Sequence, residues 1–512
     1  MKKREFKLHP AILLFILTII VMIISSVGSI LNLETTYYNV NSVTGELETQ
    51  VVMINNLFNR TGLQYLVSNM ISNFMTFAPL CTLIVGLMGV GVAYKSGFLN
   101  AFFKLITKNK PKKLFTFLVV LLGIISSMFF EAGYVILLPI AAILFMNIGR
   151  HPSIGVTAAF AGISFGYGAN LVVNGVDNTL LTYTQTATKI LDQNYRVSIT
   201  GNIIFMIVAT FLIAYLGMII TEKYTVPKLG KFNLEEEEGI DLETEVTTRE
   251  KKGVVIAILF TILVSIVLIY CIIPGLPFSG LFLNLQEKSY VAQLFGEGSY
   301  FRQGSVLIFA ALLGFCGLVY GIRVKTIKNS KDLMDSMSYY LKGFASLLIL
   351  IFFAAQFVLI FKETNIGVFI VVSLTELLEG MQLSGIVLIM LTFIIIMICT
   401  FFVPTLSTKW AIMSPVLVPM FMQSSFTPEF AQAVFRAADS SMKGITPLFT
   451  YFVILLGFLQ IYNNKKRDVV TLTDGMSLML PYAIGFAILW LLILLAFYII
   501  GIPLGLNTGV MI

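Results

Sequence analysis

Long runs of apolar residues, separated by short polar and basic segments, recur along almost the whole chain. Each run holds about 20 residues or more, which is enough for one helix to cross roughly 30 Å of hydrocarbon. The pattern predicts nine membrane-spanning helices, at residues 10–31, 67–94, 153–175, 198–221, 253–273, 303–322, 343–379, 428–461 and 477–501.

Two further apolar stretches, at residues 114–149 and 385–423, are too long for one ordinary helix and are interrupted in the middle. The interruptions are Glu131-Ala132-Gly133 in the first stretch and the segment from Pro404 to Lys409 in the second. We interpret each stretch as a re-entrant hairpin, which returns to the side of the membrane from which it entered. The predicted fold class is an all-α polytopic membrane protein with about nine transmembrane helices and two re-entrant hairpins.

Composition indicates that lipid is the solvent of this chain. Hydrophobic residues make up 57% of the sequence and charged residues 12%, and the mean hydropathy is +0.90. The net charge of +7 does not indicate a nucleic-acid partner, because Lys and Arg stand in short clusters between apolar runs. The four cysteines lie in apolar segments without the spacing of a metal site or a disulfide framework.

The distribution of basic residues predicts the orientation of the chain. The connections at 95–113, 222–252, 323–342 and 462–476 carry most of the Lys and Arg, whereas those at 32–66, 176–197, 274–302 and 362–384 carry few. A cytoplasmic N-terminus places the first group inside, as the positive-inside rule requires, provided that both broken stretches act as hairpins. We expect a multi-pass protein of the cytoplasmic (inner) cell membrane, with 222–252 and its acidic run at 235–238 as a cytoplasmic linker.

Two blocks of the chain share a pattern that predicts an internal inverted repeat. Pro139 and Pro152 are 13 residues apart, as are Pro415 and Pro428. The alignment that superimposes these two pairs of prolines also superimposes Gly168 on Gly444. Each block has the order helix, hairpin, helix, and the charge-derived topology gives the two blocks opposite orientations. We place the first repeat at 67–185, with hairpin 114–149, and the second at 343–461, with hairpin 385–423, followed by the final helix at 477–501.

Inverted repeats with interrupted helices are typical of secondary transporters, because broken helices leave backbone groups free to hold substrate or ions. The sequence has no Gly-rich phosphate loop and no HExxH or GxSxG motif, and it contains only two histidines. These features favour a transport domain that uses an ion gradient over an enzyme or an ATPase.

The segment GANLVVNGVDNTLLTYTQ at 168–185 contains three asparagines and an aspartate after an apolar helix. Such a mixture is expected to be unwound and to line a polar cavity. Asn170 and Asn174 are candidate substrate ligands. Asp177 either lines this cavity, where it could couple an ion or a proton, or lies in an exposed outer loop.

In the second broken stretch, PTLSTKWAIMSP at 404–415 places hydroxyl groups and Trp410 at the break. Ser407 and free backbone carbonyls could coordinate Na⁺, and the indole of Trp410 could stack on a planar ligand. The alternative is an interfacial tryptophan beside a Lys409 whose ammonium reaches the membrane surface.

Arg436 and Asp439, in FRAADSSMKG, stand three residues apart inside an apolar stretch. Each charge at the centre of a membrane helix costs roughly 2.5 to 3.5 kcal/mol, so such residues normally face a pathway. Arg436 could bind a substrate carboxylate, and Asp439 could bind a cation or a proton. The alternative is a structural ion pair between the two.

The segments NGVDNTLL, STKWAIMSPVLVPMF and FRAADSSMKGITPLFTYFVILLGFLQIY resemble the p-aminobenzoyl-glutamate transporter (AbgT) family, and the resemblance covers essentially the whole chain. It implies a homodimer and assigns functional positions to Asp177, Trp410, Pro428, Arg436 and Asp439. Some members carry an amide where this chain has Thr400, which is expected to alter ion or ligand coordination.

The resemblance implies transport of p-aminobenzoyl-glutamate or a related small aromatic carboxylate, coupled to Na⁺ or protons, with no other cofactor. We expect Trp410, Pro428, Arg436, Asn170 and Asn174 to bind substrate, and Asp177, Asp439, Thr400 and Ser407 to couple the ion. The alternative within the family is a proton-driven efflux pump for sulfonamides and p-aminobenzoate. An intramembrane enzyme is a remote alternative.

Overall fold

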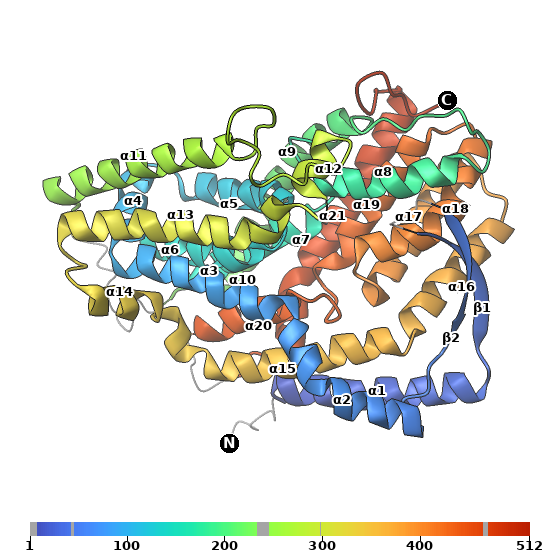
Figure 1. Cartoon of the computed structure of the whole chain (residues 1–512), viewed down its shortest axis with the longest axis horizontal. Coiled ribbons are helices and arrows are strands. Elements are labelled where there is room, and N and C mark those ends of the chain that lie inside the picture. Colours follow the sequence, from blue (N-terminus) through green and yellow to red (C-terminus); the bar gives the residue numbers. More distant parts are fainter. Residues whose placement is uncertain (1–7, 42–45, 233–244, 297, 464–468) are drawn as a thin grey trace.

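The computed structural model describes residues 8–41, 46–232, 245–296, 298–463 and 469–512. Within these residues the protein is helical apart from one two-stranded sheet (Figure 1). Nine helical segments of the described chain are long and apolar enough to cross a membrane. They are α1 (Pro10–Ile30), α2 with α3 (Arg60–Lys95), α5 and its last turn (Lys112–Phe129), α9 with α10 (Ile203–Leu229), α11 (Thr248–Tyr270), α13 (Tyr300–Val324), α15 (Ala345–Glu363), α17 (Gly385–Phe402) and α21 (Leu472–Ile500).

This count agrees with the sequence prediction, but two of its members differ. The predicted helix at 153–175 ends early, because α7 (Pro152–Phe165) is followed by a non-helical segment rich in Gly and Asn. The predicted helix at 428–461 is two helices, α19 (Pro428–Lys443) and α20 (Phe452–Ile461). Pro447 lies between them, and proline cannot continue a helix without losing a backbone hydrogen bond. In the count of nine, these two predicted helices are replaced by α5 and α17, the first helices of the two broken stretches.

Two other predicted single helices are also divided. The segment predicted at 67–94 consists of α2 (Arg60–Thr76) and α3 (Ala78–Lys95), with Pro79 at the start of α3. The segment predicted at 343–379 consists of α15 and α16 (Ile366–Gly380). Between the latter two, Asn365 has a φ of 60°, a left-handed conformation that interrupts a right-handed helix.

Each of the two broken apolar stretches ends at the end of the molecule where it began. In the first, α5 leads through the break to α6 (Leu138–Asn147), and Arg150 Nη1 donates to Thr116 Oγ1 at 3.1 Å. In the second, α17 leads to α18 (Leu406–Gln423), and Ser424 Oγ donates to the Leu383 carbonyl at 3.4 Å. Each stretch therefore doubles back on itself, and its re-entry into a membrane stays a prediction.

The connections of the chain gather at two opposite ends. At one end, marked by α4 (Phe98–Thr107) and α14 (Ser330–Met337) on the left of Figure 1, Lys108 pairs with Glu245 at 3.0 Å and Thr326 Oγ1 donates to the Ser96 carbonyl at 2.8 Å. These contacts join three of the basic connections. Which end faces the cytoplasm stays a prediction, and the acidic run at 235–238 lies outside the described residues.

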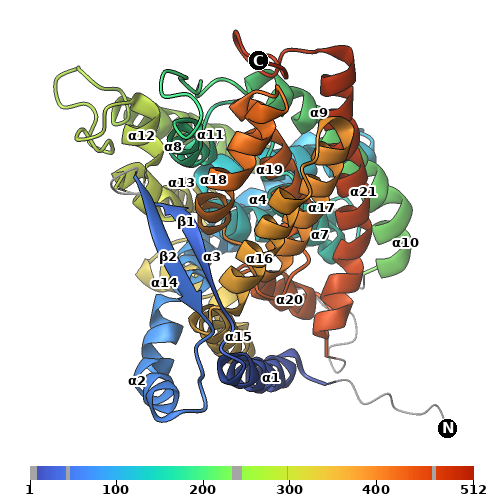
Figure 2. The same cartoon turned by 90° about the vertical axis from the view of Figure 1, so that its right-hand side faces the viewer.

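The long connection at 32–66 contains the only sheet in the described chain. Its strands, β1 (Glu34–Val40) and β2 (Leu47–Met53), are antiparallel, with Glu34 opposite Met53. The strand pair lies at the side of the helical body, near α16 and α18 (Figures 1 and 2). Asn365 Nδ2 donates to the Met53 carbonyl at 3.1 Å, which joins this connection to the one at 362–384. The all-α prediction therefore omitted one small hairpin.

The two glycines aligned by the proposed repeat pack against each other's helices. A Cβ atom on Gly168, after α7, would lie 2.6 Å from the Arg436 carbonyl oxygen in α19. A Cβ atom on Gly444, after α19, would lie 2.8 Å from Ser164 and Phe165 in α7. The absence of a side chain at both positions allows the ends of α7 and α19 to approach closely. The repeat itself stays a prediction.

We predict that Gly168→Ala lowers the thermal stability of the detergent-solubilised protein, because overpacking against backbone costs about 1–3 kcal/mol. Gly380→Ala is the matched control, since nothing lies within 4 Å of the Cβ it would add. Thermal unfolding followed by tryptophan fluorescence measures both. Equal melting temperatures for the two variants would contradict the close approach.

Candidate functional site

Six charged side chains are buried in the described chain, and four of them lie on α19. Glu429, Arg436, Asp439 and Lys443 are separated by seven, three and four residues, a spacing that places them on one face of the helix. This helix packs against α7, α17, α18, α21 and α8 (Gly175–Thr188). Because charges are costly in a medium of low dielectric constant, each requires a partner from a neighbouring element.

Arg436 pairs with Asp177 across two helices. Arg436 Nη1 lies 2.8 Å from Asp177 Oδ1, and the two side chains are 1% and 5% exposed. Asp177 also caps α8, because its Oδ2 accepts a hydrogen bond from the backbone N–H of Asn174 at 2.9 Å. Asn174 Oδ1 in turn accepts from the Val176 N–H at 2.8 Å. Asp177 is therefore buried, and the alternative of an exposed outer loop is wrong.

The unwound segment predicted at 168–185 is shorter than expected. Residues 166–174 are non-helical, but α8 begins at Gly175 because Asn174 and Asp177 form a capping box. Asn170 is fully buried in the non-helical part, and its Nδ2 donates to Ser127 Oγ at 3.2 Å. Asn170 thus ties this segment to the break of the first hairpin.

Asp439 forms the second buried ion pair, with Lys409 of α18, and both side chains are completely buried. Lys409 Nζ also donates to Thr400 Oγ1 at 2.9 Å, while Asp439 Oδ2 has no hydrogen-bond partner in the described structure. Two alternatives are therefore wrong. Lys409 does not reach the membrane surface, and Arg436 and Asp439 pair with other residues rather than with each other.

Trp410 is buried in the interior and is not part of an interfacial belt. Its Nε1 donates to Thr184 Oγ1 at 2.9 Å, and its ring centroid lies 4.4 Å from that of Phe435. Gln432 Nε2 donates to the same hydroxyl at 2.7 Å. The indole therefore already has one aromatic neighbour within the protein. Stacking of Trp410 on a ligand stays a prediction.

Pro428 and Glu429 lie at the start of α19, away from the two ion pairs. Eight residues separate Pro428 from Arg436, which corresponds to about 12 Å along a helix. Glu429 Oε2 accepts from the Tyr195 hydroxyl at 2.9 Å, and Glu429 Oε1 accepts from the Ser198 N–H at 2.9 Å. Burial, together with the Glu429 carboxylate, raises the pKa of Tyr195 above its ordinary value, so this phenol remains a neutral donor.

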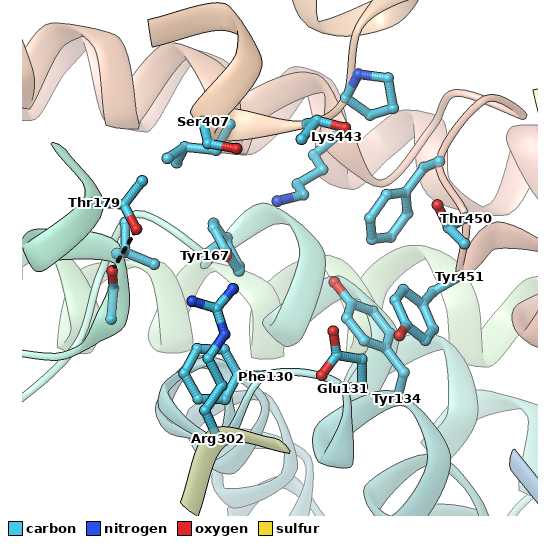
Figure 3. A pocket seen from close by; sticks show the side chains of 16 residues that line it. Phe130, Glu131, Tyr134, Tyr167, Thr179, Arg302, Ser407, Lys443, Thr450 and Tyr451 are labelled. Atoms are coloured by element: carbon cyan, nitrogen blue, oxygen red, sulfur yellow. Dashed lines mark hydrogen bonds between the residues drawn. The ribbon is translucent and has the colours of Figure 1, made fainter. Parts of the chain in front are cut away.

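A cavity of about 240 Å³ lies between the breaks of the two hairpins (Figure 3). Ser407 is the one predicted site residue that lines it. Sequence reasoning missed the charged lining residues Glu131, Arg302 and Lys443. The spacing could have revealed Lys443, which stands four residues after Asp439, but nothing near Arg302 in the sequence links it to the hairpins. The lining residues are Phe130, Glu131, Tyr134, Tyr167, Gly175, Val176, Thr179, Arg302, Pro404, Thr405, Leu406, Ser407, Lys443, Phe449, Thr450 and Tyr451.

We predict that the Lys409–Asp439 pair contributes through charge compensation. Lys409→Met leaves a buried carboxylate without its cation and is expected to cost about 3–5 kcal/mol of stability. The double variant Lys409→Met/Asp439→Asn is expected to lose less than the single lysine variant, because it buries no uncompensated charge. Thermal unfolding in detergent measures the two losses.

The exposed pair of Lys108 and Glu245 provides the control, with side chains 66% and 86% exposed. Lys108→Met is expected to change stability by less than about 1 kcal/mol. A double variant at 409 and 439 that loses as much stability as Lys409→Met, or more, would refute charge compensation.

The sequence model of the AbgT putative transporter family matches residues 6–512. The chain is 31% identical over 497 residues to the p-aminobenzoyl-glutamate transport protein of Escherichia coli (strain K12), covering 97% of this chain and 93% of the relative. Among solved structures it is similar to MtrF of Neisseria gonorrhoeae, described as one of a class of antimetabolite efflux pumps, with 32% identity, 98% coverage of both chains and a TM-score of 0.50. It is also similar to the YdaH transporter of Alcanivorax borkumensis, with 30% identity, 98% and 100% coverage and a TM-score of 0.49. The protein is therefore a multi-pass membrane transporter, not an enzyme, and it belongs to the AbgT family.

Proposed function

We propose that this transporter moves p-aminobenzoyl-glutamate, or a related aromatic carboxylate, by coupling to a cation gradient. The observation that carries the proposal is the polar face of α19, where buried charges adjoin the breaks of both hairpins. Ionisable groups inside a membrane protein normally mark the path of a substrate or a coupling ion. The 31% identical relative is named for transport of p-aminobenzoyl-glutamate, which supports this substrate.

Asp439 is the proposed coupling residue. One of its oxygens is held by Lys409, and the other has no hydrogen-bond partner among the described residues. A Na⁺ ion or a proton can bind at the oxygen that has no partner, and its positive charge weakens the attraction between this carboxylate and the Lys409 ammonium. Either event favours the release of Lys409, so the pair can exist in two arrangements.

The proposed movement displaces the hairpin-bearing repeats, residues 67–185 and 343–461, against the rest of the chain. Asp177 participates because its pairing with Arg436 joins the start of α8 to α19, and Thr400 participates through its bond to Lys409. A homodimer is part of the same proposal, and it rests on the family resemblance.

Export of sulfonamides and p-aminobenzoate is the second candidate function. Its support is the similarity to the gonococcal MtrF protein, which is described as belonging to a class of antimetabolite efflux pumps. The same buried charges could serve movement in either direction, because a carboxylate that binds a cation can couple its gradient to symport or to antiport.

We predict that proteoliposomes containing the protein accumulate radiolabelled p-aminobenzoyl-glutamate under an imposed Na⁺ or proton gradient. The gradient that drives accumulation identifies the coupling ion. Asp439→Ala and Arg436→Ala are each expected to abolish accumulation, since one removes the coupling carboxylate and the other leaves Asp177 buried without its cation.

Lys108→Ala, in the exposed ion pair, is the control and is expected to transport as the wild type does. Gel filtration verifies that each variant is folded. Unchanged accumulation in both site variants would refute the role of the buried charges. No accumulation by folded wild-type protein, together with gradient-driven sulfonamide transport, would favour the export function.

A further inference from the structure

The cavity between the hairpin breaks contains two cations that face each other. Lys443 enters it from α19 and Arg302 from the start of α13, and Tyr167 lies between them in Figure 3. The two residues come from opposite sides of the cavity and from segments more than 140 residues apart in sequence. Two positive side chains directed into one cavity favour an anionic ligand.

Lys443 forms no ion pair with a described residue, although the carboxylates of Asp439 and Glu131 lie close enough to attract its ammonium. Its side chain is only 6% exposed, and no hydrogen bond or ion pair joins it to any other described residue. Its Nζ lies 3.4 Å from the ring centroid of Tyr167 and 5.6 Å from that of Phe449. Cation–π contacts of this kind stabilise the ammonium, but they leave N–H donors that can reach a carboxylate in the cavity.

Arg302 is also held mainly by an aromatic ring. Its guanidinium carbon lies 4.8 Å from the centroid of Phe130, and the one hydrogen bond that its guanidinium donates to a described residue is a long one, 3.5 Å from Nη1 to the Phe295 carbonyl. The planar fork of an arginine can bind a carboxylate through two parallel hydrogen bonds. Arg302 therefore retains donors for a ligand.

Arg436, by contrast, has its Nη1 bound to Asp177 and does not line the cavity. The carboxylate partner expected of Arg436 is thus supplied from within the protein in this structure. The cavity offers Lys443 and Arg302 in its place.

The remaining walls suit a flat ring with an N–H donor. Tyr134 and Tyr451 are stacked, with centroids 4.6 Å apart and an interplanar angle of 11°, and Phe449 continues the aromatic surface. Glu131 also lines the cavity, and its carboxylate has no hydrogen-bond or ion-pair partner among the described residues, so it can accept a hydrogen bond from an amine. The volume of about 240 Å³ lies below the roughly 300 Å³ of drug-sized pockets, which favours one ring with a short acidic tail.

We propose that this cavity is the substrate site and that Lys443 and Arg302 each bind one carboxylate of an aromatic dicarboxylate. The ring lies against the tyrosine and phenylalanine walls, and Glu131 accepts a hydrogen bond from the amino group. This inference rests on the proposed function and names the residues and the ligand class of that site.

The test is equilibrium binding of two radiolabelled probes, p-aminobenzoyl-glutamate and p-aminobenzoate, to the purified full-length protein. Lys443→Gln and Arg302→Gln are each expected to weaken p-aminobenzoyl-glutamate binding by about tenfold to hundredfold, because each removes one charged contact. p-Aminobenzoate has a single carboxylate, so only one of the two variants is expected to weaken its binding to that extent. Lys443→Arg is expected to restore most of the affinity.

Lys95→Gln is the matched control, because Lys95 makes a similar contact, 5.0 Å from the ring centroid of Tyr339, and does not line this cavity. It is expected to bind both probes with wild-type affinity. Wild-type affinity for p-aminobenzoyl-glutamate in folded Lys443→Gln and Arg302→Gln would overturn the inference and leave the proposed function intact. Failure of the wild-type protein to bind or transport either probe would overturn both. Equal losses for both probes in both variants would refute the assignment of one carboxylate to each cation.

Discussion

The burial of four charged side chains on α19 is the constraint on which the packing of the neighbouring helices depends. A charge that leaves water for a medium of low dielectric constant costs several kcal/mol unless a partner compensates it. Each charged residue on the buried face of this helix takes its partner from a different part of the chain. The contacts are Glu429 with Tyr195 and Ser198, Arg436 with Asp177, Asp439 with Lys409, and Lys443 with the ring of Tyr167.

These contacts bring both broken stretches to one place. Lys409 lies in the first turn of α18, at the break of the second stretch, and Asn170 bonds to Ser127 at the break of the first. Between the breaks lies a cavity whose own charges are not compensated in the same way. The two buried ion pairs thus join the helices of the frame, while Lys443, Arg302 and Glu131 remain available to a ligand. A transporter needs both, because a site that satisfied all its charges internally would gain nothing from binding an anion.

The sequence predicted the features that depend on local chemistry. Interruptions such as Glu131-Ala132-Gly133 and the segment after Pro404 mark the breaks, since an apolar stretch of that length needs a turn. Partners could not be predicted, because they depend on which helices meet. The spacing of Arg436 and Asp439 left a mutual pair open as the alternative to a pathway, yet their partners come from α8 and α18. Arg302 was missed for the same reason. Pro447 is a local signal for the division of the predicted helix 428–461, but the prediction followed the apolar character of the segment and did not use it.

The most direct measurement of the central claim, that the cavity between the hairpin breaks holds the substrate, is ligand protection of a cysteine placed in its wall. Thr179→Cys, in a protein whose four native cysteines are replaced by alanine, would be labelled with a water-soluble thiol reagent at increasing concentrations of p-aminobenzoyl-glutamate. Thr182→Cys, which is exposed one turn further along α8, is the control. We expect the ligand to slow labelling at residue 179 in proportion to its binding and to leave labelling at residue 182 unchanged. Equal labelling rates at residue 179 with and without saturating ligand, in protein that binds the ligand, would contradict the account.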